Sequence, residues 1–478
     1  MKNFIFKHLI IFFLVVSIYS CKEKKKEKPN ILFIFADDQA YNTIHALGNE
    51  EIQTPNLDNM VREGTCFTHA YNMGAWHGAV CVASRTMLVT GQYVWHARES
   101  EPHLDSLSNM NHLWSQMLQE QGYDTYFSGK WHVKIHPDSI FDYTRHIRPG
   151  MPGTVPEAYN RPVKGEEPQW QPWDKSVGGF WKGGKHWSEV LADDAEDFMQ
   201  QASADEDPFF MYLAFNAPHD PRQSPKKFVD MYPQEEIQVP ENYMPEYPYK
   251  EEIGCGENLR DERLAPFPRT EYAVRTHRSE YYAIISHMDR QIGRILKALE
   301  ESGKADNTYI FFTADHGLAC GNHGLMGKQN MYDHSMRAPL LVLGPDIPED
   351  KKLDMNVYLQ DIMPSTINLA GMEKPEYVEF NSLMPYIEGK QKESAYDNIY
   401  GCYRDLQRMI RNDEYKLIAY PEAEKLRLFN VQEDPLEMND LADQQEQQER
   451  IERMFRELEE LSVQMGDTLK LEKHFPNI

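Results

Sequence analysis

Three long apolar runs in this chain each end in residues that can carry chemistry. They are NILFIFADDQ from Asn30 to Gln39, FFMYLAFNAPH from Phe209 to His219 and TYIFFTADHG from Thr308 to Gly317. Apolar runs without alternation are typical of strands that are buried on both faces of a parallel sheet. Because ligand sites of open α/β sheets lie beyond the carboxyl ends of the strands, this pattern predicts an α/β fold with its functional site along one sheet edge.

The sequence also predicts one long helix, and near residue 375 the expected secondary structure changes to short antiparallel strands and a charged helix. Ser279–Ser302 has apolar residues at spacings of three and four and is followed by Gly303, as expected of an amphipathic helix with a glycine stop. Further on, RMIRNDEYKLIAY and KLRLFNV are typical of short antiparallel strands, and about residues 445–465 predict a charged helix with one apolar stripe. We therefore expect a main domain over residues 29–375 and a smaller C-terminal α+β subdomain over residues 376–478.

The first 28 residues differ from the rest of the chain. A basic start, the apolar run LIIFFLVVSIY and a small Ser20 before Cys21 indicate a secretory signal over residues 1–20, which is too short to span a membrane. SIYSC resembles a bacterial lipobox with Ile18 in place of the usual leucine, so we expect lipidation of Cys21. Residues 21–28 then form a charged tether. We expect an exported lipoprotein of a Gram-negative bacterium, in the periplasm or at the cell surface on the outer membrane; a plain secreted protein cut nearby is the alternative.

Net charge and cysteine content narrow the possible partners. The net charge of -25 disfavours nucleic acid, whose phosphates need a basic face. An anionic substrate would need a local positive pocket against this overall field. Four cysteines besides Cys21 and Cys81 leave open whether any pair forms a disulfide: Cys66, Cys255, Cys320 and Cys402.

Acidic residues follow two of the three apolar runs. Asp37 and Asp38 end the first run, and Asp315 and His316 end the last. Carboxylates that converge on one sheet edge would repel one another unless a cation lay between them. The sequence therefore predicts a metal site, where the oxygen ligands favour calcium or magnesium and His316 leaves a transition metal open.

Basic residues occur in two further segments. GYDTYFSGKWH, from Gly122 to His132, places Lys130 and His132 two residues apart on the same side of an extended segment. GNHGLMGKQNMYDHS follows the Asp315 strand, is too rich in glycine and polar residues to be core, and offers Lys328 as a substrate contact. Each of these residues taken alone would be interpreted as a surface or packing residue.

The segment CVASR, from Cys81 to Arg85, connects these observations. It resembles the signature Cys (or Ser)-x-Pro (or Ala)-x-Arg of the formylglycine-dependent (type I) sulfatases of the alkaline phosphatase superfamily, with Ala83 in place of the commoner proline. GYDTYFSGKWH resembles the second signature of that family, and residues 54–71 and 428–442 resemble further family segments. The resemblance runs from about Pro29 to beyond Ala442. It implies an alkaline phosphatase-like fold, in which helices sandwich a large mixed, mainly parallel sheet.

The resemblance implies a sulfuric ester hydrolase that works through a modified residue. A formylglycine-generating maturase would oxidise Cys81 to formylglycine, an aldehyde that hydrates to a geminal diol. One hydroxyl, activated by the metal, would attack sulfur, and the other would then let the resulting ester collapse and expel sulfate. One calcium ion would be held by Asp37, Asp38, Asp315 and His316 together with residue 81.

The same resemblance implies roles for the basic residues. Arg85, one turn beyond Cys81, would hold the diol, and the helix N-terminus would favour the sulfate anion. Lys130 and Lys328 would bind sulfate and neutralise its oxygens. His132 would take a proton from the diol, and His219, also a substrate contact, would protonate the leaving oxygen.

The expected substrate is a sulfated polysaccharide or oligosaccharide. Half of the eight tryptophans, Trp170, Trp173, Trp181 and Trp187, lie in one Gly- and Pro-rich insert, and aromatic faces suit sugar rings. A loop packed on itself is the alternative for this insert. The alternatives for the function are a small-molecule sulfatase, acting on choline or aryl sulfate, and a phosphodiesterase of the same superfamily, which would use Thr or Ser and usually two zinc ions. A non-catalytic carbohydrate-binding relative would lack some of the charged site residues, and this chain has them all.

Overall fold

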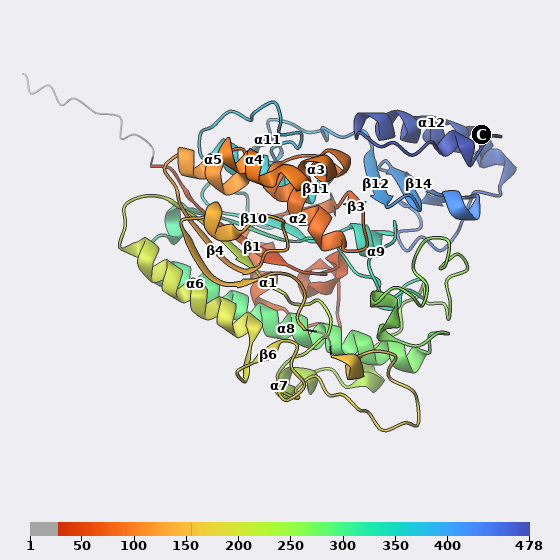
Figure 1. The fold of residues 1–478 in the computed structure, drawn as a ribbon, viewed down its shortest axis with the longest axis horizontal. Coiled ribbons are helices and arrows are strands. Elements are labelled where there is room, and N and C mark those ends of the chain that lie inside the picture. Colours follow the sequence, from red (N-terminus) through yellow and green to blue (C-terminus); the bar gives the residue numbers. More distant parts are fainter. Residues whose placement is uncertain (1–26, 154) are drawn as a thin grey trace, which may run out of the picture.

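The computed structural model describes residues 27–153 and 155–478, so the predicted signal and the lipidation site at Cys21 lie outside the described residues. Eight strands of the described part form one mixed sheet (Figure 1). Their order across the sheet is β11 (Lys351–Tyr358), β2 (Thr65–Tyr71), β10 (Leu340–Leu343), β9 (Thr308–Ala314), β1 (Asn30–Ala36), β8 (Phe209–Ala214), β4 (Asp124–Lys130) and β5 (Tyr143–Arg148). The three predicted strands are confirmed, and they lie next to one another in the middle of the sheet.

The four central strands are parallel and end level with one another. β1 pairs in parallel with β9 and with β8, and β8 pairs in parallel with β4. Register places Ala36 of β1 opposite Ala314 of β9, and Ala214 of β8 opposite Gly129 of β4. Every residue of β1 and β8 is buried, as the uninterrupted apolar runs predict.

Helices cover both faces of this sheet (Figure 1). On one side lie α1 (Pro55–Glu63), α6 (Trp187–Ser203) and α8 (Glu271–Glu301), and on the other lie α2 (Val80–Thr90), α3 (Val94–Ser100), α4 (Leu104–Asn109) and α5 (Trp114–Glu120). This arrangement is the predicted sandwich of helices around a mixed, mainly parallel sheet.

The longest helix begins earlier than predicted. α8 starts at Glu271, whereas the apolar spacing predicts a start at Ser279. Thr270 caps the true N-terminus by accepting a hydrogen bond from the backbone of Ala273. The first two turns are mostly polar, so their short buried stretch around Val274 gives no periodic signal. The predicted glycine stop is confirmed, since Gly303 has a φ of 74° just beyond the helix.

The C-terminal part forms a second sheet of four antiparallel strands, and one short strand from the main domain joins its edge in parallel. Its order is β15 (Lys425–Asn430), β14 (Tyr415–Tyr420), β13 (Gln407–Arg411), β12 (Ile399–Tyr403) and β3 (Gly74–Ala75). Helix α12 (Gln448–Gln464) covers it with the predicted apolar stripe, of which Phe455 and Leu458 are buried. β3 lies a few residues before Cys81, so this sheet is joined directly to the segment that carries Cys81.

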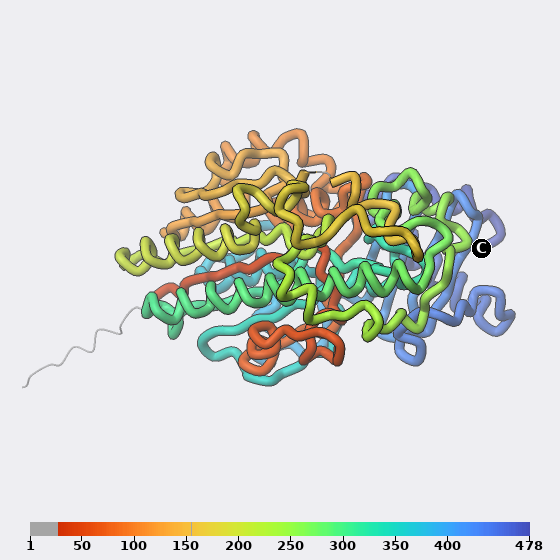
Figure 2. The backbone as a smooth tube through the Cα atoms, turned by 90° about the horizontal axis from the view of Figure 1, so that it is seen from below, coloured from red at the N-terminus to blue at the C-terminus, as the bar shows by residue number. Residues whose placement is uncertain are grey.

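Two further observations concern the whole described chain. The five cysteines of the described residues, Cys66, Cys81, Cys255, Cys320 and Cys402, are buried and unpaired. Within the described ranges, no helix has both the length and the apolar character needed to cross a membrane. Figure 2 shows the start of the described chain at one end of the molecule and the C-terminal subdomain at the other.

Candidate active site

The carboxyl ends of the four central strands bring seven of the predicted site residues to one edge. β9 leads into Asp315 and His316, β1 into Asp37 and Asp38, β8 into His219, and β4 ends at Lys130 with His132 just beyond. Backbone hydrogen bonds hold these ends together, from Asp315 N to Ala36 O at 3.3 Å and from Asp37 N to Ala217 O at 3.0 Å. The local geometry of the site thus follows from strand pairing.

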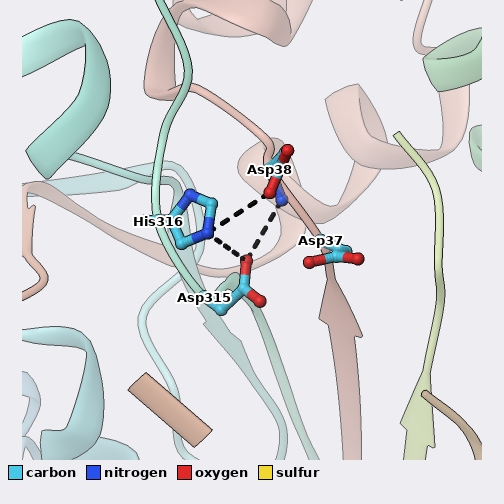
Figure 3. Close-up of side chains that lie close together, drawn as sticks. All are labelled: Asp37, Asp38, Asp315 and His316. Carbon is cyan, nitrogen blue, oxygen red and sulfur yellow. Dashed lines mark hydrogen bonds and ion pairs between the residues drawn. The ribbon is translucent and has the colours of Figure 1, made fainter. Parts of the chain in front are cut away.

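The three aspartates and His316 form a buried cluster (Figure 3). Each offers one ligand atom, and these atoms all lie within 4.8 Å of one another. His316 Nε2 is 3.2 Å from Asp38 Oδ1 and 3.5 Å from Asp315 Oδ1. The backbone N–H of Asp38 donates a hydrogen bond to Asp315 Oδ1 at 3.1 Å, and the backbone of Asp38 is left-handed, with a φ of 71°. The set can hold one metal ion.

The unpaired atoms of the cluster test whether a cation fits. Asp37 Oδ1, Asp38 Oδ1 and His316 Nε2 are buried and have no hydrogen-bond partner within the described residues. Leaving one such atom unsatisfied costs about 1–3 kcal/mol. Burial raises the pKa of Asp38 to about 7, although Lys328 and His316 oppose this shift. A divalent cation would satisfy all three atoms and favour the ionised carboxylate, so the residues fit such an ion.

Cys81 lies beside this cluster as the second residue of α2. Its Sγ is 3.2 Å from Nδ1 of His132. Burial opposes ionisation, but the Lys130 charge and the hydrogen bond with His132 hold the pKa of the Cys81 thiol well below its usual range. The positive N-terminal end of α2 also favours negative charge here. Residue 81 therefore occupies a pocket built for an anion.

Arg85 and Lys130 link the helix to the acidic cluster. Arg85 Nε is 3.2 Å from Asp315 Oδ2, and its Nη1 donates to the carbonyl of Lys130 at 2.6 Å. Lys130 Nζ forms an ion pair with Asp37. Both cationic side chains are fully buried. Because each is held by a carboxylate of the cluster, the positions of cations and metal ligands are set together.

Lys328 and His219 are the remaining predicted site residues. Lys328 contacts Asp38 Oδ2, whereas His316 contacts Asp38 Oδ1. Lys328 Nζ is 2.7 Å from Asp38 Oδ2 and 3.0 Å from Nε2 of His219. Nδ1 of His219 donates to the carbonyl of Asp220 at 2.8 Å, which leaves Nε2 as the nitrogen that faces the site. Every residue predicted for the site is thus in one cluster, although Lys328 comes from a loop with no regular structure.

A cavity of about 360 Å³ opens onto this cluster. Cys81, His132, His219 and Lys328 line its inner part. The other lining residues are Gly78, Ala79, Met151, Leu259, Arg260, Asp261 and Gln329.

The sequence analysis did not predict the remaining residues that line the cavity, among them Arg260 and Asp261. Arg260 and Asp261 lie in ENLRDERLAPF, which has neither an apolar run nor a glycine signature. Asp220 was the one residue of this group that the sequence could have indicated, because it directly follows the predicted site residue His219. It pairs with Arg260 at 2.9 Å.

The four tryptophans of the insert do not line the cavity. Trp170 and Trp181 are buried, and Trp173 and Trp187 are half-buried. A cation lies over each ring: Arg161 over Trp170 at 4.2 Å, Lys226 over Trp173 at 5.0 Å, Lys175 over Trp181 at 5.1 Å and Arg148 over Trp187 at 3.7 Å. These cation–π contacts within the protein fit the alternative of an insert packed on itself, and stacking of the rings on sugar stays a prediction.

Comparisons with known proteins agree over nearly the whole chain. A family model described as "Sulfatase" matches residues 29–372, and one described as "N-sulphoglucosamine sulphohydrolase, C-terminal" matches residues 321–464. An arylsulfatase of Clostridium perfringens is 29% identical in an alignment of 455 residues that covers 87% of this chain and 90% of that protein. An ulvan-active sulfatase of Formosa agariphila is 25% identical and covers 97% of this chain and 88% of its own length. A solved structure in complex with its substrate, D-glucosamine-2-N,6-O-disulfate, has the same fold, with a TM-score of 0.71 at 22% identity, covering 92% of this chain and 98% of that one.

Proposed function

The chain belongs to the sulfatase family, with its alkaline phosphatase-like fold, and hydrolyses sulfate esters; from that premise we propose that its substrates are sulfated sugars of polysaccharides or oligosaccharides. The outer cavity supports this choice because it combines apolar Met151 and Leu259 with polar Arg260, Asp261 and Gln329. A sugar ring needs both kinds of surface. Relatives named for ulvan and for a sulfated glucosamine substrate are consistent with it.

Calcium is the proposed metal, held by Asp37, Asp38, Asp315 and His316 with residue 81. Carboxylate oxygens dominate the set, and such ligands suit a hard cation. When bound, the ion would supply positive charge that polarises the sulfate ester and lowers the pKa of a coordinated hydroxyl.

Formylglycine is the proposed working form of residue 81, made from Cys81 by a maturase. In hydrated form it supplies a hydroxyl nucleophile and a second hydroxyl that allows sulfate release. The single observation that carries this proposal is the place of Cys81, at the start of α2, with Sγ 3.2 Å from His132 Nδ1 and beside a buried cluster with unpaired carboxylate oxygens.

The side chains around residue 81 then have separate tasks. Lys130 and Lys328 place two buried ammonium groups where the oxygens of a sulfate ester would lie against the cluster. Arg85 holds the strand end of Lys130 and the carboxylate of Asp315 in position. His132 accepts a proton from residue 81. His219 directs Nε2 toward Lys328 and the cavity and, once its imidazole is protonated, donates that proton to the leaving oxygen.

A screen of substrates tests the proposed substrate class. Defined sulfated oligosaccharides and monosaccharides are compared with choline sulfate and 4-nitrophenyl sulfate, and released sulfate is measured. We expect the highest kcat/KM for one of the sulfated sugars. Turnover confined to the small esters would replace this proposal with the aryl or choline sulfatase alternative.

Location at a membrane is the remaining part of the proposal. Lipidation of Cys21 would tie the N-terminus to the outer membrane, in the periplasm or at the cell surface. We expect wild-type protein in the membrane fraction of a Gram-negative host and Cys21→Ser in the soluble fraction. Equal distribution of both proteins would contradict a lipid anchor.

A further inference from the structure

A second cavity lies beside the active site, between the tryptophan-bearing insert and the longest helix. Its volume is about 560 Å³, against about 360 Å³ for the active-site cavity. This size falls in the range of roughly 300–1,000 Å³ that is typical of ligand pockets. Most of its lining comes from the insert between Pro156 and Gln171, and α8 contributes Tyr272, Thr276 and Glu280. None of the residues predicted for catalysis lines it.

Tyr159 lies between the two cavities. It lines the second cavity, and its hydroxyl donates to Asp220 Oδ2 at 2.7 Å. The same carboxylate oxygen accepts a hydrogen bond at 2.9 Å from Nη1 of Arg260, which lines the active-site cavity. This Nη1 is also 3.4 Å from the Tyr159 hydroxyl. Only the Tyr159 side chain therefore separates the lining of one cavity from that of the other.

A buried ion pair fixes one wall of the second cavity. Arg161 donates to Glu280 Oε1 at 2.7 Å and also pairs with Glu280 Oε2. The guanidinium of Arg161 lies over the ring of Trp170 at 4.2 Å, and Nε2 of His277 is 2.9 Å from the carbonyl oxygen of Arg161. Because these contacts within the protein hold the wall in place, ordering it around a ligand costs little.

The rest of the lining offers polar groups that are free to bind a ligand. Among the lining side chains that form no hydrogen bond or ion pair with another described residue are Asn160, Glu166, Glu167 and Gln171. Trp170 also lines the cavity, and its buried Nε1–H has no partner in the described part of the chain. Carboxylate and amide oxygens accept hydrogen bonds from hydroxyl groups, and amide and indole N–H groups donate to them. A lining of this kind suits a sugar.

We infer that the second cavity binds an uncharged sugar unit of the same chain whose sulfated ring enters the active site. Arg161 is the one cation among the described residues that line the cavity, and it is already paired with Glu280. No cation of the lining is thus free for a second sulfate, and the exposed Glu166 and Glu167 disfavour an anion there. This inference rests on the proposed action on sulfated sugars and adds that the enzyme binds more than one ring.

The dependence of turnover on chain length tests the second site. The first probes are N-acetylglucosamine 6-sulfate and N-acetyllactosamine sulfated at the same position. The second are galactose 6-sulfate and singly sulfated galactose tri- and tetrasaccharides. For the sugar that the wild-type enzyme hydrolyses, we expect kcat/KM to be about tenfold higher for the longer substrate, mainly through a lower KM, because contacts to the uncharged rings add binding energy.

Two changes in the second cavity should bring the kcat/KM values of the short and long substrates together. Glu167→Ala with Gln171→Ala removes two free polar groups of the insert, and Thr276→Trp fills the cavity from α8. The control is Gln200→Ala with Glu206→Ala, which alters the same residue types at exposed positions outside the lining. It should keep the advantage of the longer substrate. If Thr276→Trp does not fold, the changes at the two insert residues still decide.

The possible outcomes separate this inference from the proposed function. Equal kcat/KM for short and long substrates of the wild-type enzyme overturns the second site and leaves action on sulfated sugars intact. An advantage of the longer substrate that survives every change in the cavity also overturns it. Spermine binding in calorimetry that Glu167→Ala weakens, without any effect of chain length, would assign the cavity to a cationic ligand instead. No turnover of any sulfated sugar, with aryl sulfate hydrolysed, overturns the proposed function and this inference with it.

Discussion

Each buried cation of the site is held by a carboxylate that also belongs to the acidic cluster. Lys130 pairs with Asp37, Arg85 with Asp315 and Lys328 with Asp38. This arrangement explains how a chain with a net charge of -25 can present a positive pocket to a sulfate ester. The positive charge is local, and under the proposed function it depends on a divalent ion that these carboxylates would share.

The role of His219 as general acid can be tested by comparing substrates whose leaving groups differ in their need for a proton. A sugar alkoxide is a poor leaving group and needs protonation, whereas 4-nitrophenolate leaves without it. We expect His219→Ala to lower kcat for a sulfated sugar by about 10²–10⁴-fold and to affect 4-nitrophenyl sulfate far less. An equal loss with both substrates would contradict the role of His219 as general acid.

At the scale of elements, the order of the strands builds the site, because the neighbouring strands β9, β1, β8 and β4 end at its residues. Sequence patterns predicted the three apolar strands and the residues at their ends, because burial on both faces leaves an uninterrupted apolar run. They did not predict Arg260, whose position depends on how a loop packs against Asp220. Nor could they show that Trp170 is buried beside Arg161, since composition does not reveal which face of a ring is open.

One buried ion pair contributes to the attachment of the C-terminal subdomain. Arg408 of β13 pairs with Asp467, which follows α12, and both side chains are almost fully buried. Tyr400 donates to Asp467 Oδ2 at 2.8 Å and accepts from Trp95 of α3 at 2.9 Å. The pair therefore connects β13, β12 and α3.

Asp467→Asn should lower the free energy of unfolding by about 3–5 kcal/mol, because it leaves the buried Arg408 without its partner. Asp405→Asn is the control, since Asp405 is exposed and 3.9 Å from Arg408, and it should change stability by ~0–1 kcal/mol. Denaturant unfolding at neutral pH measures both effects. A loss below 1 kcal/mol for Asp467→Asn would contradict the role of this pair.

The same pair predicts a pH dependence. Burial opposes ionisation of Asp467, but hydrogen bonds from Arg408 hold its pKa below the ordinary value. A carboxylate with a lowered pKa in the folded state contributes stability above its unfolded pKa of about 3.9. That contribution is lost as pH falls through the folded pKa. The difference in stability between wild type and Asp467→Asn should therefore shrink below pH 4, and a constant difference down to pH 3 would contradict this.

At the scale of the molecule, the acidic cluster and the shared sheet connect parts that are far apart in sequence. The cluster joins residues 37–38 to residues 315–316, and β3 joins the segment before Cys81 to the C-terminal sheet. A ligand that binds only the folded state should therefore stabilise the chain as a whole.

Calcium should raise the midpoint of thermal unfolding of chelator-treated protein. At free calcium of 100 times Kd the stabilisation is about 2.7 kcal/mol. Asp315→Asn should abolish both the shift and the activity, while Asp194→Asn should keep the shift, since Asp194 is also buried but is bonded to Ser128 and His146. A midpoint that does not respond to calcium in active wild-type protein would place the metal elsewhere.

The state of residue 81 in active protein tests the central claim most directly. Trypsin should release the peptide from Glu63 to Arg85, which contains both Cys66 and Cys81. After unfolding and alkylation, mass spectrometry should find one alkyl group, on Cys66, and an aldehyde or its hydrate at position 81. Two alkyl groups on this peptide in a fully active preparation would contradict the account, because the thiol of Cys81 would then be the working group.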